Sequence, residues 1–337
     1  MKILLVQTSF LGDTILSTPV IAGIKRLHPE AELWMLTTPV SAGLVQGDPL
    51  LAGVLTFDKR RRDAGLRGLL RKARELKSHQ FDRVYALHRS WRTAFLLFLA
   101  GIPCRIGFQE ARLPFLLHRR SSRKGLEHEV LRNLMVLSGE AGLGSFDPAL
   151  RLFPPSAEQP QSEIMGSLPS PGSYVCVVPG SVWFTKRWHA DNYKELVHSL
   201  VESGTPVLVL GDRSEAETAE HVCAGTGARN LCGLTTIPEM MQVVRNAKGL
   251  VCNDSMSLHL GSAFKIPTAT IFCATSPKFG FGPWLNPRAE VIERTGLPCK
   301  PCSRHGGNAC PVRTEACMRE VKSEEVLQAL RRVISIS

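Results

Sequence analysis

The sequence predicts a two-domain α/β protein built on parallel sheets, and three observations indicate it. Short apolar runs alternate with amphipathic helical stretches, a pattern typical of strands covered by helices on both faces. Six prolines gather within residues 148–171, and the same alternation starts again after them. The length of 337 residues suits two domains of ordinary size. We therefore expect one domain over residues 1–155, a second over 172–337, and a linker over 148–171.

The first domain is expected to begin with a buried strand over Lys2–Gln7. Gly12 then allows a turn, and a helix follows over about Thr14–Leu27. Three further strands, each followed by a helical pattern, are expected over Glu32–Thr37, Val54–Asp58 and Arg83–His88.

The second domain repeats this order of strands and helices. A strand over Tyr174–Val178 precedes a helix that ends at Gly204. The apolar face of that helix is predicted to consist of Tyr193, Leu196, Val197, Leu200 and Val201. Further strands are expected over Pro206–Leu210, Gly249–Asn253 and Thr268–Cys273. A last helix over about Ser323–Val333 ends the chain, and packing back onto the first domain is one option for it.

Charge and composition limit the classes of function. The 41 Lys and Arg residues against 30 Asp and Glu give a net charge of +11, which favours an anionic partner. Nucleotides, phosphorylated glycolipids, membrane faces and nucleic acids all qualify. The longest apolar stretch, Ala94–Ile102, is far shorter than the roughly 20 residues that span a bilayer, and no signal peptide is recognised. We therefore expect a cytoplasmic protein that is at most peripheral to the inner membrane.

The first motif with chemistry is Thr8–Thr14, at the end of the first strand. Asp13 is expected near the N-terminus of the following helix, where a carboxylate could act as a general base on a hydroxyl group. A helix-capping role explains an aspartate there equally simply and is favoured from this motif alone. The sequence contains no G-x-x-x-x-G-K-[ST] pattern, which argues against a P-loop kinase or NTPase.

Two further motifs follow strands of the second domain. Pro179–Trp188 combines a Gly-Ser turn with Lys186 and Arg187, a composition that favours phosphate binding over a merely solvated basic loop. Asn253–Leu260 would offer a helix N-terminus to an anion, although Asp254 itself would repel a phosphate and suits a sugar hydroxyl better. Taken alone, His259 is expected to be a structural, hydrogen-bonded histidine.

Four cysteines near the C-terminus have a spacing that could hold a metal ion. Cys299, Cys302, Cys310 and Cys317 include one C-x-x-C pair in a Gly- and Pro-rich segment, so four thiolates could bind a structural zinc ion. An iron–sulfur cluster, disulfides or free thiols that pin the loop are the alternatives. Because the chain shows no secretory signal, reduced thiols or metal ligands are favoured over disulfides.

Two basic clusters, at residues 59–62 and 119–124, lie near apolar segments in the sequence. The apolar neighbours are Trp91, Phe95, Leu96, Phe98 and Pro114–Leu117, and this combination favours an anionic lipid surface. Nucleic acid is disfavoured because no RNA- or DNA-binding motif accompanies the charge. A Rossmann dinucleotide site is also disfavoured, since no G-x-G-x-x-G opens either domain.

Taken in order, these segments resemble the bacterial lipopolysaccharide heptosyltransferase family, which uses ADP-heptose. The resemblance covers nearly the whole chain and leans toward the second-heptose (heptosyltransferase II) type. The segments that carry it are Gly12–Thr14, His88–Ser90, Arg105–Phe108, Pro179–Trp188, Asn253–Leu260 and Phe279–Trp284. The loop over Cys299–Met318 is similar to one found in many members.

The resemblance implies a GT-B fold, in which two Rossmann-like doubly wound parallel-sheet domains face a cleft. It implies inverting transfer of heptose from ADP-L-glycero-D-manno-heptose to the lipopolysaccharide inner core, with no cofactor required. Asp13 matches the family's catalytic base, which reverses the preference for a cap. Donor contacts would come from Ser181, Thr185, Lys186, Asp254, Ser255, Met256 and His259. The lipid A–core acceptor would be contacted by Arg60, Arg61, Arg89 and Arg132.

Three positions depart from the family pattern. Met256 stands where glycine is usual, Cys273-Ala274 replaces Gly-Pro, and Glu315 replaces a common histidine. The Met256 side chain would crowd the approach of the donor diphosphate. Two alternatives therefore stay open. One is a related transferase that uses another nucleotide sugar, and the other is a degenerate, non-catalytic protein that binds a nucleotide or lipid.

Overall fold

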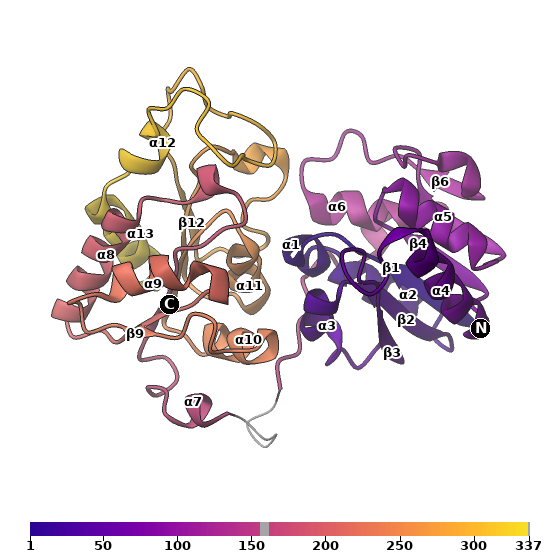
Figure 1. Ribbon diagram of the computed structural model, residues 1–337, viewed down its shortest axis with the longest axis horizontal. Helices are drawn as coiled ribbons and strands as arrows, with labels where there is room; N and C mark the ends of the chain where they lie inside the picture. The colour runs from indigo at the N-terminus through magenta and orange to yellow at the C-terminus, as the bar shows by residue number, and fades with distance from the viewer. Residues whose placement is uncertain (156–161, 336–337) are drawn as a thin grey trace. The chain divides into compact units, whose positions relative to one another are not determined.

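The computed structural model describes residues 1–155 and 162–335, which divide into two compact units. The N-terminal unit comprises Met1–Phe153 and the C-terminal unit Pro154–Ser337 (Figure 1). The predicted linker therefore falls mainly in the C-terminal unit, where a short helix α7 (Glu163–Gly166) forms. Residues 156–161 of that linker lie outside the described residues.

The N-terminal unit contains a six-stranded parallel sheet in the order β3-β2-β1-β4-β5-β6. This is the strand order of a doubly wound Rossmann sheet. Its strands are β1 (Lys2–Val6), β2 (Glu32–Thr37), β3 (Gly53–Thr56), β4 (Arg83–Ala86), β5 (Cys104–Phe108) and β6 (Arg119–Ser121). Its helices are α1 (Leu11–Ile15), α2 (Thr18–Leu27), α3 (Pro39–Val45), α4 (Gly65–Ser78), α5 (Trp91–Leu99) and α6 (Glu129–Leu134), with 3₁₀ turns η1 (Pro114–Leu116), η2 (Met135–Leu137) and η3 (Leu143–Ser145).

The C-terminal unit repeats the arrangement with a parallel sheet in the order β12-β11-β10-β7-β8-β9. Its strands are β7 (Val175–Val178), β8 (Val207–Val209), β9 (Arg229–Asn230), β10 (Gly249–Asn253), β11 (Thr268–Ile271) and β12 (Ala289–Ile292). Its longer helices are α8 (Ala190–Glu202), α9 (Ala216–Cys223), α10 (Ile237–Arg245), α11 (Met256–Phe264) and α13 (Ser323–Ser335). Shorter elements are α12 (Ala316–Arg319) and the 3₁₀ turns η4 (Phe184–Lys186), η5 (Arg213–Glu215) and η6 (Pro277–Phe279).

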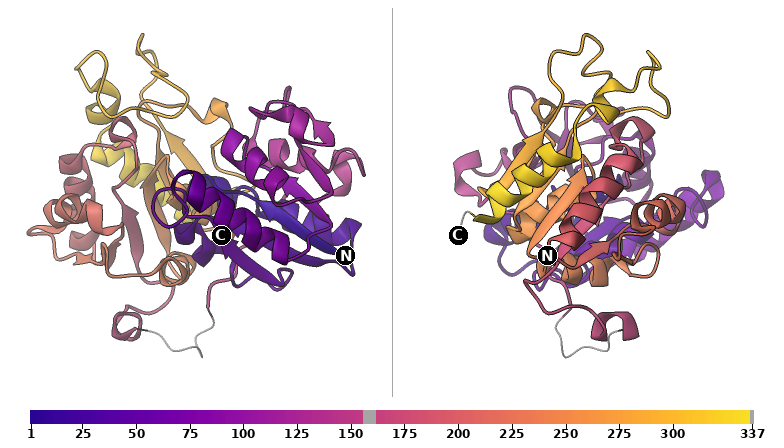
Figure 2. Two further views of the ribbon diagram at one scale, coloured as in Figure 1. Left: turned by 45° about the vertical axis from the view of Figure 1, so that its right-hand side comes forward. Right: turned by 90° about the vertical axis from the view of Figure 1, so that its left-hand side faces the viewer.

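Alternating strand residues bury both faces of each sheet. In β1, Leu4 and Val6 join the apolar cluster under α4 and α5, while the intervening Ile3 and Leu5 are equally buried. In the C-terminal unit, α8 and α13 lie side by side over one face of the sheet (Figure 2, right). The apolar residues of α13 are buried in that core, so the final helix packs within its own unit.

The single helix expected over Thr14–Leu27 is instead two helices, α1 and α2. Pro19 near the start of α2 has no N–H for the helix ladder, which ends the first helix ahead of it. Hydroxyl groups satisfy the carbonyls left over at the break. Ser17 Oγ donates to the C=O of Thr14 at 2.7 Å, and Thr18 Oγ1 donates to the C=O of Ile15 at 2.8 Å.

Candidate active site

Asp13 lies beyond the carboxyl end of β1, where the strand order of the N-terminal sheet reverses. Such reversal points are where doubly wound sheets bind ligands. Asp13 is the third residue of α1 and not its N-cap, which is Phe10. Its Oδ2 accepts from Ser9 Oγ at 2.8 Å and from the Phe10 N–H at 3.3 Å. Among the described residues nothing donates to Oδ1, so this oxygen is available to accept a proton.

Two opposing influences set the pKa of Asp13. Burial raises the pKa, and the negative charge of Glu129 adds to that effect. The hydrogen bonds from Ser9 and Phe10 and the positive charge of Arg123 lower it, but the net pKa stays above the ordinary value. A raised pKa makes the ionised carboxylate a stronger base.

A lysine and a histidine that the sequence analysis gave no role in the active site lie at the same sheet edge. Lys59 follows β3, and its ammonium donates to the C=O of Thr8 at 2.8 Å and to His88 Nδ1 at 3.2 Å. Burial and then Arg92 lower the pKa of Lys59 to about 8. Burial, followed by the charges of Lys59 and Arg89, lowers the pKa of His88 to about 3. His88 is therefore neutral at pH 7 and accepts the lysine's hydrogen bond.

Three of the predicted acceptor-binding arginines follow strands at this edge. Arg60 and Arg61 come after β3 and are exposed, and their backbone N–H groups bind Asp58 Oδ1 at 3.2 and 3.0 Å. Arg89 comes after β4 and is also exposed. The guanidinium groups of this set therefore lie on the surface around the end of the sheet that holds Asp13.

Arg132 has a different place from the other three arginines. It lies in α6, is half-buried, and donates to the C=O groups of Leu126 and Glu127 at 2.9 and 3.1 Å. Its guanidinium also lies 3.5 Å from Glu129 Oε2. These contacts hold the loop that precedes α6, beside the pair formed by Arg123 and Glu129.

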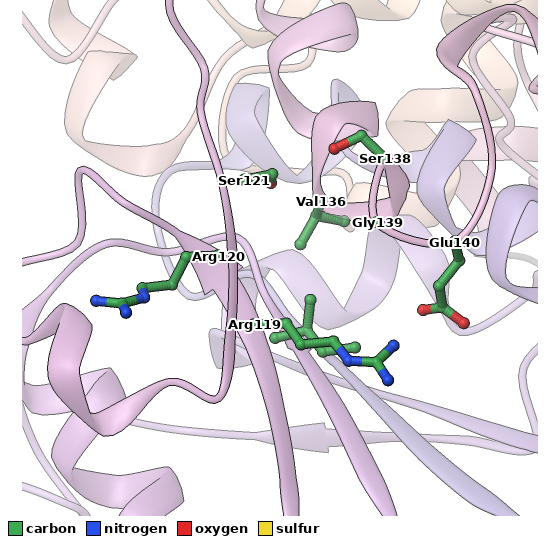
Figure 3. A pocket seen from close by; sticks show the side chains of 8 residues that line it. Arg119, Arg120, Ser121, Val136, Ser138, Gly139 and Glu140 are labelled. Atoms are coloured by element: carbon green, nitrogen blue, oxygen red, sulfur yellow. The ribbon is translucent and has the colours of Figure 1, made fainter.

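A separate small cavity of about 110 Å³ opens beside β6 (Figure 3). Arg119 and Arg120 line it together with Glu140, which also binds Arg83 at 2.6 Å and the Tyr85 hydroxyl at 2.5 Å. The carboxylate is thereby committed to a structural network. None of the predicted site residues lines this cavity.

In the C-terminal unit, two predicted donor residues form an ion pair. Lys186, from the loop after β7, places its Nζ 2.6 Å from Asp254 Oδ2, which follows β10. The Thr275 hydroxyl donates to the same oxygen at 2.7 Å. Because β7 and β10 are adjacent where the strand order reverses, both motifs meet at the ligand-binding edge of this sheet.

Asn253 joins the loop after β7 to the end of β10. Its Oδ1 accepts from the Trp188 N–H at 2.9 Å, and its Nδ2 donates to the C=O of Pro179 at 2.7 Å and of Gly180 at 3.3 Å. The side chain is completely buried. It therefore fixes both ends of the donor loop, which we define as residues 179–188.

The remaining predicted donor residues differ in exposure. Ser181 is buried, and its C=O accepts from Arg187 Nε at 2.8 Å. Ser255 caps α11, and its Oγ is buried without a hydrogen-bond partner among the described residues. Met256, the first residue of α11, is half-buried, and His259 is buried one turn further on. The orphaned Ser255 hydroxyl is the group most suited to a ligand.

Thr185 does not lie open to a ligand. Only 2% of its surface is exposed. Its N–H donates to the C=O of Gly307 at 3.0 Å, and its Oγ1 accepts from the Gly307 N–H at 2.8 Å. These bonds connect the donor loop to the cysteine-containing segment near the C-terminus.

Glu215 is a further carboxylate at this edge that sequence reasoning missed. A Cβ atom at Gly180 would lie 1.8 Å from Glu215 Oε1, so only glycine permits this close approach. Glu215 Oε2 accepts from the Asp212 N–H at 3.0 Å, and burial raises the pKa of the Glu215 carboxyl. In the sequence, the glycine at position 180 is the one sign that another group approaches the backbone there.

The four cysteines lie in one region of the C-terminal unit, where burial, and after it the charges of Cys302, Cys299 and Cys310, raise the pKa of Cys317 to about 11. Over residues 1–155 and 162–335, no group of three or more His, Cys, Asp and Glu side chains is placed to hold a metal ion. Cys317 is buried in α12, whereas Cys310 is half-exposed in the preceding loop. Burial opposes ionisation of Cys310, but backbone N–H groups of residues 312–315 outweigh it and lower its pKa. Zinc binding by these cysteines stays a prediction.

Sequence comparison places the chain among known proteins. The model of glycosyltransferase family 9 (heptosyltransferase) matches residues 69–311. The chain belongs to this family. As a family 9 member it is a glycosyltransferase, and the predicted α/β class with two Rossmann-like units is confirmed as the GT-B fold of the heptosyltransferases.

Individual relatives of this family 9 chain match along most of their length. Lipopolysaccharide heptosyltransferase 2 of Escherichia coli K12 is 25% identical over 316 residues, covering 87% of this chain and 88% of that protein. The structure of E. coli ADP-heptose lps heptosyltransferase II is similar with a TM-score of 0.77 at 22% identity, covering 99% and 98%. A family 9 glycosyl transferase of Veillonella parvula has a TM-score of 0.83 at 20% identity, covering 100% and 98%.

Proposed function

We propose that this chain transfers heptose from ADP-L-glycero-D-manno-heptose to the inner core of lipopolysaccharide, with inversion at the anomeric carbon. The observation that carries the proposal is that each sheet places one group the reaction needs where its strand order reverses. The N-terminal unit holds a carboxylate, Asp13, with a raised pKa. The C-terminal unit holds a cation, Lys186, beside Asp254. Two of the relatives named above, both from E. coli, are named as heptosyltransferases of lipopolysaccharide, which supports the choice of substrates.

In the proposed reaction Asp13 acts on the acceptor. Its carboxylate takes the proton of the acceptor hydroxyl as that oxygen attacks C1 of the heptose. The bond from C1 to the donor phosphate breaks, and its electron pair leaves with ADP. Lys186 stabilises the negative charge that develops on the leaving diphosphate. General base catalysis of this kind contributes about 10²–10⁴-fold to a rate.

In the proposed donor site, the positive charge of Lys186 is paired with the negative charge of Asp254. Without donor, the carboxylate neutralises the ammonium and keeps it at the sheet edge. A diphosphate competes for the ammonium, whose three donors can bind both a phosphate and Asp254. The buried hydroxyl of Ser255 and the remaining oxygen of Asp254 would then bind hydroxyl groups of the donor sugar.

Substitution Asp13→Asn tests the role of the base. We expect a loss of heptosyl transfer of 10²-fold or more, because the amide cannot take a proton. The affinity for ADP, measured by calorimetry, should stay within twofold of the unmodified protein, since Asp13 belongs to the acceptor unit. Unchanged transfer by the variant would show that another group removes the proton.

The choice of nucleotide separates the proposal from its two alternatives. Thermal unfolding with ADP, UDP and GDP should show stabilisation by ADP alone, about 2.7 kcal/mol at 100 times its Kd. A preference for UDP or GDP would indicate a transferase with a different donor. Binding of ADP without transfer to any core acceptor would favour a degenerate binding protein, in which the half-buried Met256 crowds the site.

The charge distribution supports an anionic acceptor on the N-terminal unit. Residues 1–153 contain 23 Lys and Arg against 13 Asp and Glu, a net charge of +10. Residues 154–337 contain 18 against 17, a net charge of +1. A phosphorylated glycolipid is therefore attracted to the unit that carries Asp13, Arg60, Arg61 and Arg89.

The same unit has a surface suited to a membrane that contains such a glycolipid. No helix among the described residues is long and apolar enough to cross a membrane. However, α5 and η1 pack together and leave Phe115 73% exposed, with Phe98 and Trp91 each 47% exposed. Arg105 lies over the Phe98 ring at 5.6 Å. We define Trp91, Phe98 and Phe115 as the apolar patch and place it on the cytoplasmic face of the inner membrane.

Vesicle sedimentation tests the apolar patch. Vesicles of phosphatidylglycerol and phosphatidylethanolamine should bind the protein, and 0.5 M salt should weaken binding by screening the charges. Phe98→Ala with Phe115→Ala should reduce binding about tenfold, because two large apolar side chains no longer insert. Leu234→Ala, at a residue 53% exposed on the other unit, is the matched control and should bind normally. Equal binding by both variants would argue against this surface.

A further inference from the structure

The donor loop (residues 179–188) is tied to a distant segment that carries the four cysteines. We define residues 299–317 as the cysteine loop. Thr185 and Gly307 exchange two hydrogen bonds, Thr185 N–H to Gly307 C=O at 3.0 Å and Gly307 N–H to Thr185 Oγ1 at 2.8 Å. The two residues are 122 positions apart in the sequence.

A third segment completes this connection. The Ala274 N–H donates to the C=O of Thr185 at 3.1 Å, and the Cys302 N–H donates to the C=O of Ala274 at 2.9 Å. Thr185 therefore uses its N–H, its C=O and its hydroxyl oxygen to hold neighbouring chain segments. Only 2% of Thr185 is exposed, so these bonds are buried within the C-terminal unit.

Both partners of the charged pair are linked to these bonded residues, Lys186 by a peptide bond and Asp254 by a hydrogen bond from a neighbouring side chain. Lys186 follows Thr185, and its Nζ lies 2.6 Å from Asp254. Thr275 follows Ala274, and its hydroxyl binds Asp254 at 2.7 Å. The cysteine loop is thus connected to Lys186 through Thr185, and to the Asp254 carboxylate through Ala274 and the Thr275 hydroxyl.

Close packing strengthens the connection at Gly306. This residue has φ +83°, and a Cβ there would lie 3.1 Å from both Lys186 Cγ and Trp183 Cβ. The cysteine loop therefore covers the aliphatic part of the Lys186 side chain as well as the backbone before it. A lysine side chain is flexible, so such packing decides where its charge is held.

We propose that Thr185 is a positioning residue that, through its pair of bonds with Gly307 of the cysteine loop, holds the Lys186 ammonium where the donor diphosphate binds. This deepens the proposed function and rests on it. Thr185 then sets donor affinity without touching the donor. A loss of its hydroxyl lets the donor loop move, and Lys186 spends less time in the binding position.

Calorimetric titration with ADP tests the proposal in a double-mutant cycle. Thr185→Val keeps the shape but removes the hydroxyl, and we expect the Kd for ADP to rise about 5–10-fold. Thr185→Ser keeps the hydroxyl and should bind within twofold of the unmodified protein. If Thr185 acts through Lys186, Thr185→Val should change the Kd less than twofold in a Lys186→Met background. A role in stability alone would lower the melting temperature and leave the Kd of the folded protein unchanged.

A second pair of variants covers the case in which Thr185→Val does not fold. Gly306→Ala and Gly296→Ala place a side chain at similar positive φ, +83° and +78°, but a Cβ at Gly296 meets nothing within 4 Å. Only Gly306→Ala should weaken ADP binding, because only it presses on Lys186. The positioning role would be overturned if Gly306→Ala and Gly296→Ala bound ADP equally well. It would also be overturned if Thr185→Val and Lys186→Met had additive effects on ADP binding. Absence of ADP binding by the unmodified protein would instead overturn the proposed function and the positioning role with it.

Discussion

One oxygen of Asp13 accepts two hydrogen bonds, and the other is left for the proposed proton transfer. Oδ2 receives the hydrogen bonds from Ser9 and Phe10, which fix the orientation of the carboxylate. The short helix α1 places this side chain at its third position, where it accepts from the N–H of the N-cap residue Phe10. The capping role and the proposed base role are therefore filled by the same group.

The proposed base role of Asp13 predicts an acid limb in the pH–rate profile. A base works only when ionised, so activity should be lost as the pH falls through the pKa of Asp13, which burial raises and the Ser9 bond lowers. Ser9→Ala removes a bond that stabilises the carboxylate, so the pKa rises further and the acid limb moves to higher pH. We expect a shift of about 0.5–1 pH unit in kcat/KM. A limb that stays in place, or moves to lower pH, would show that Ser9 does not act on the catalytic carboxylate.

The site residues that could be predicted are those that a local pattern marks, namely a polar residue shortly after an apolar strand. Asp13, Lys186 and Asp254 each follow an apolar strand, and a parallel sheet places all such positions at one edge. The partner of Thr185 lies 122 residues away, and no local pattern signals that bond. For the same reason Lys59 and His88, 29 positions apart, were not recognised as a pair.

At the scale of elements, Asn253 connects β10 to the donor loop. The strand itself was predicted with its observed bounds, because its apolar run ends at a polar residue. The break between α1 and α2 was not, since the apolar periodicity continues through Pro19 while the backbone bonding does not. Periodicity reports which face is buried and says little about where one helix becomes two.

Removing the Asn253 side chain should destabilise the C-terminal unit. Asn253→Ala leaves the Trp188 N–H and the C=O of Pro179 buried without partners. We expect urea unfolding to show a loss of about 2–4 kcal/mol in the free energy of unfolding. Asn192→Ala is the control, because Asn192 also binds two backbone carbonyls but is only half-buried. An equal loss of unfolding free energy in Asn192→Ala would show that the buried bonds of Asn253 to the donor loop do not account for the effect.

At the scale of the whole molecule, each unit has its own sheet and its own apolar core. The doubly wound order of both sheets follows from apolar strands alternating with helices, which is why the fold class could be predicted. Four strands, β5, β6, β9 and β12, were not predicted. They lie on the outer side of their sheets, where β6, β9 and β12 are less completely buried and so carry a weaker apolar signal.

Calorimetric melting should resolve the two units. We expect two transitions, of which ADP raises only one, because its proposed site lies in the C-terminal unit. Leu5→Ala in β1 removes a fully buried side chain and should lower only the other transition, at a cost of about 2–5 kcal/mol. A single transition that responds to both changes would show that the units unfold together.

The chain passes from the N-terminal unit to the C-terminal unit at one point, between Phe153 and Pro154. Recombination between related genes at that point leaves both sheets and both cores whole. If the halves bind acceptor and donor as proposed, an exchange at this point would change the acceptor preference while the donor half is kept. A hybrid of this chain's first 153 residues with the second half of a relative would show which half chooses the sugar that receives the heptose.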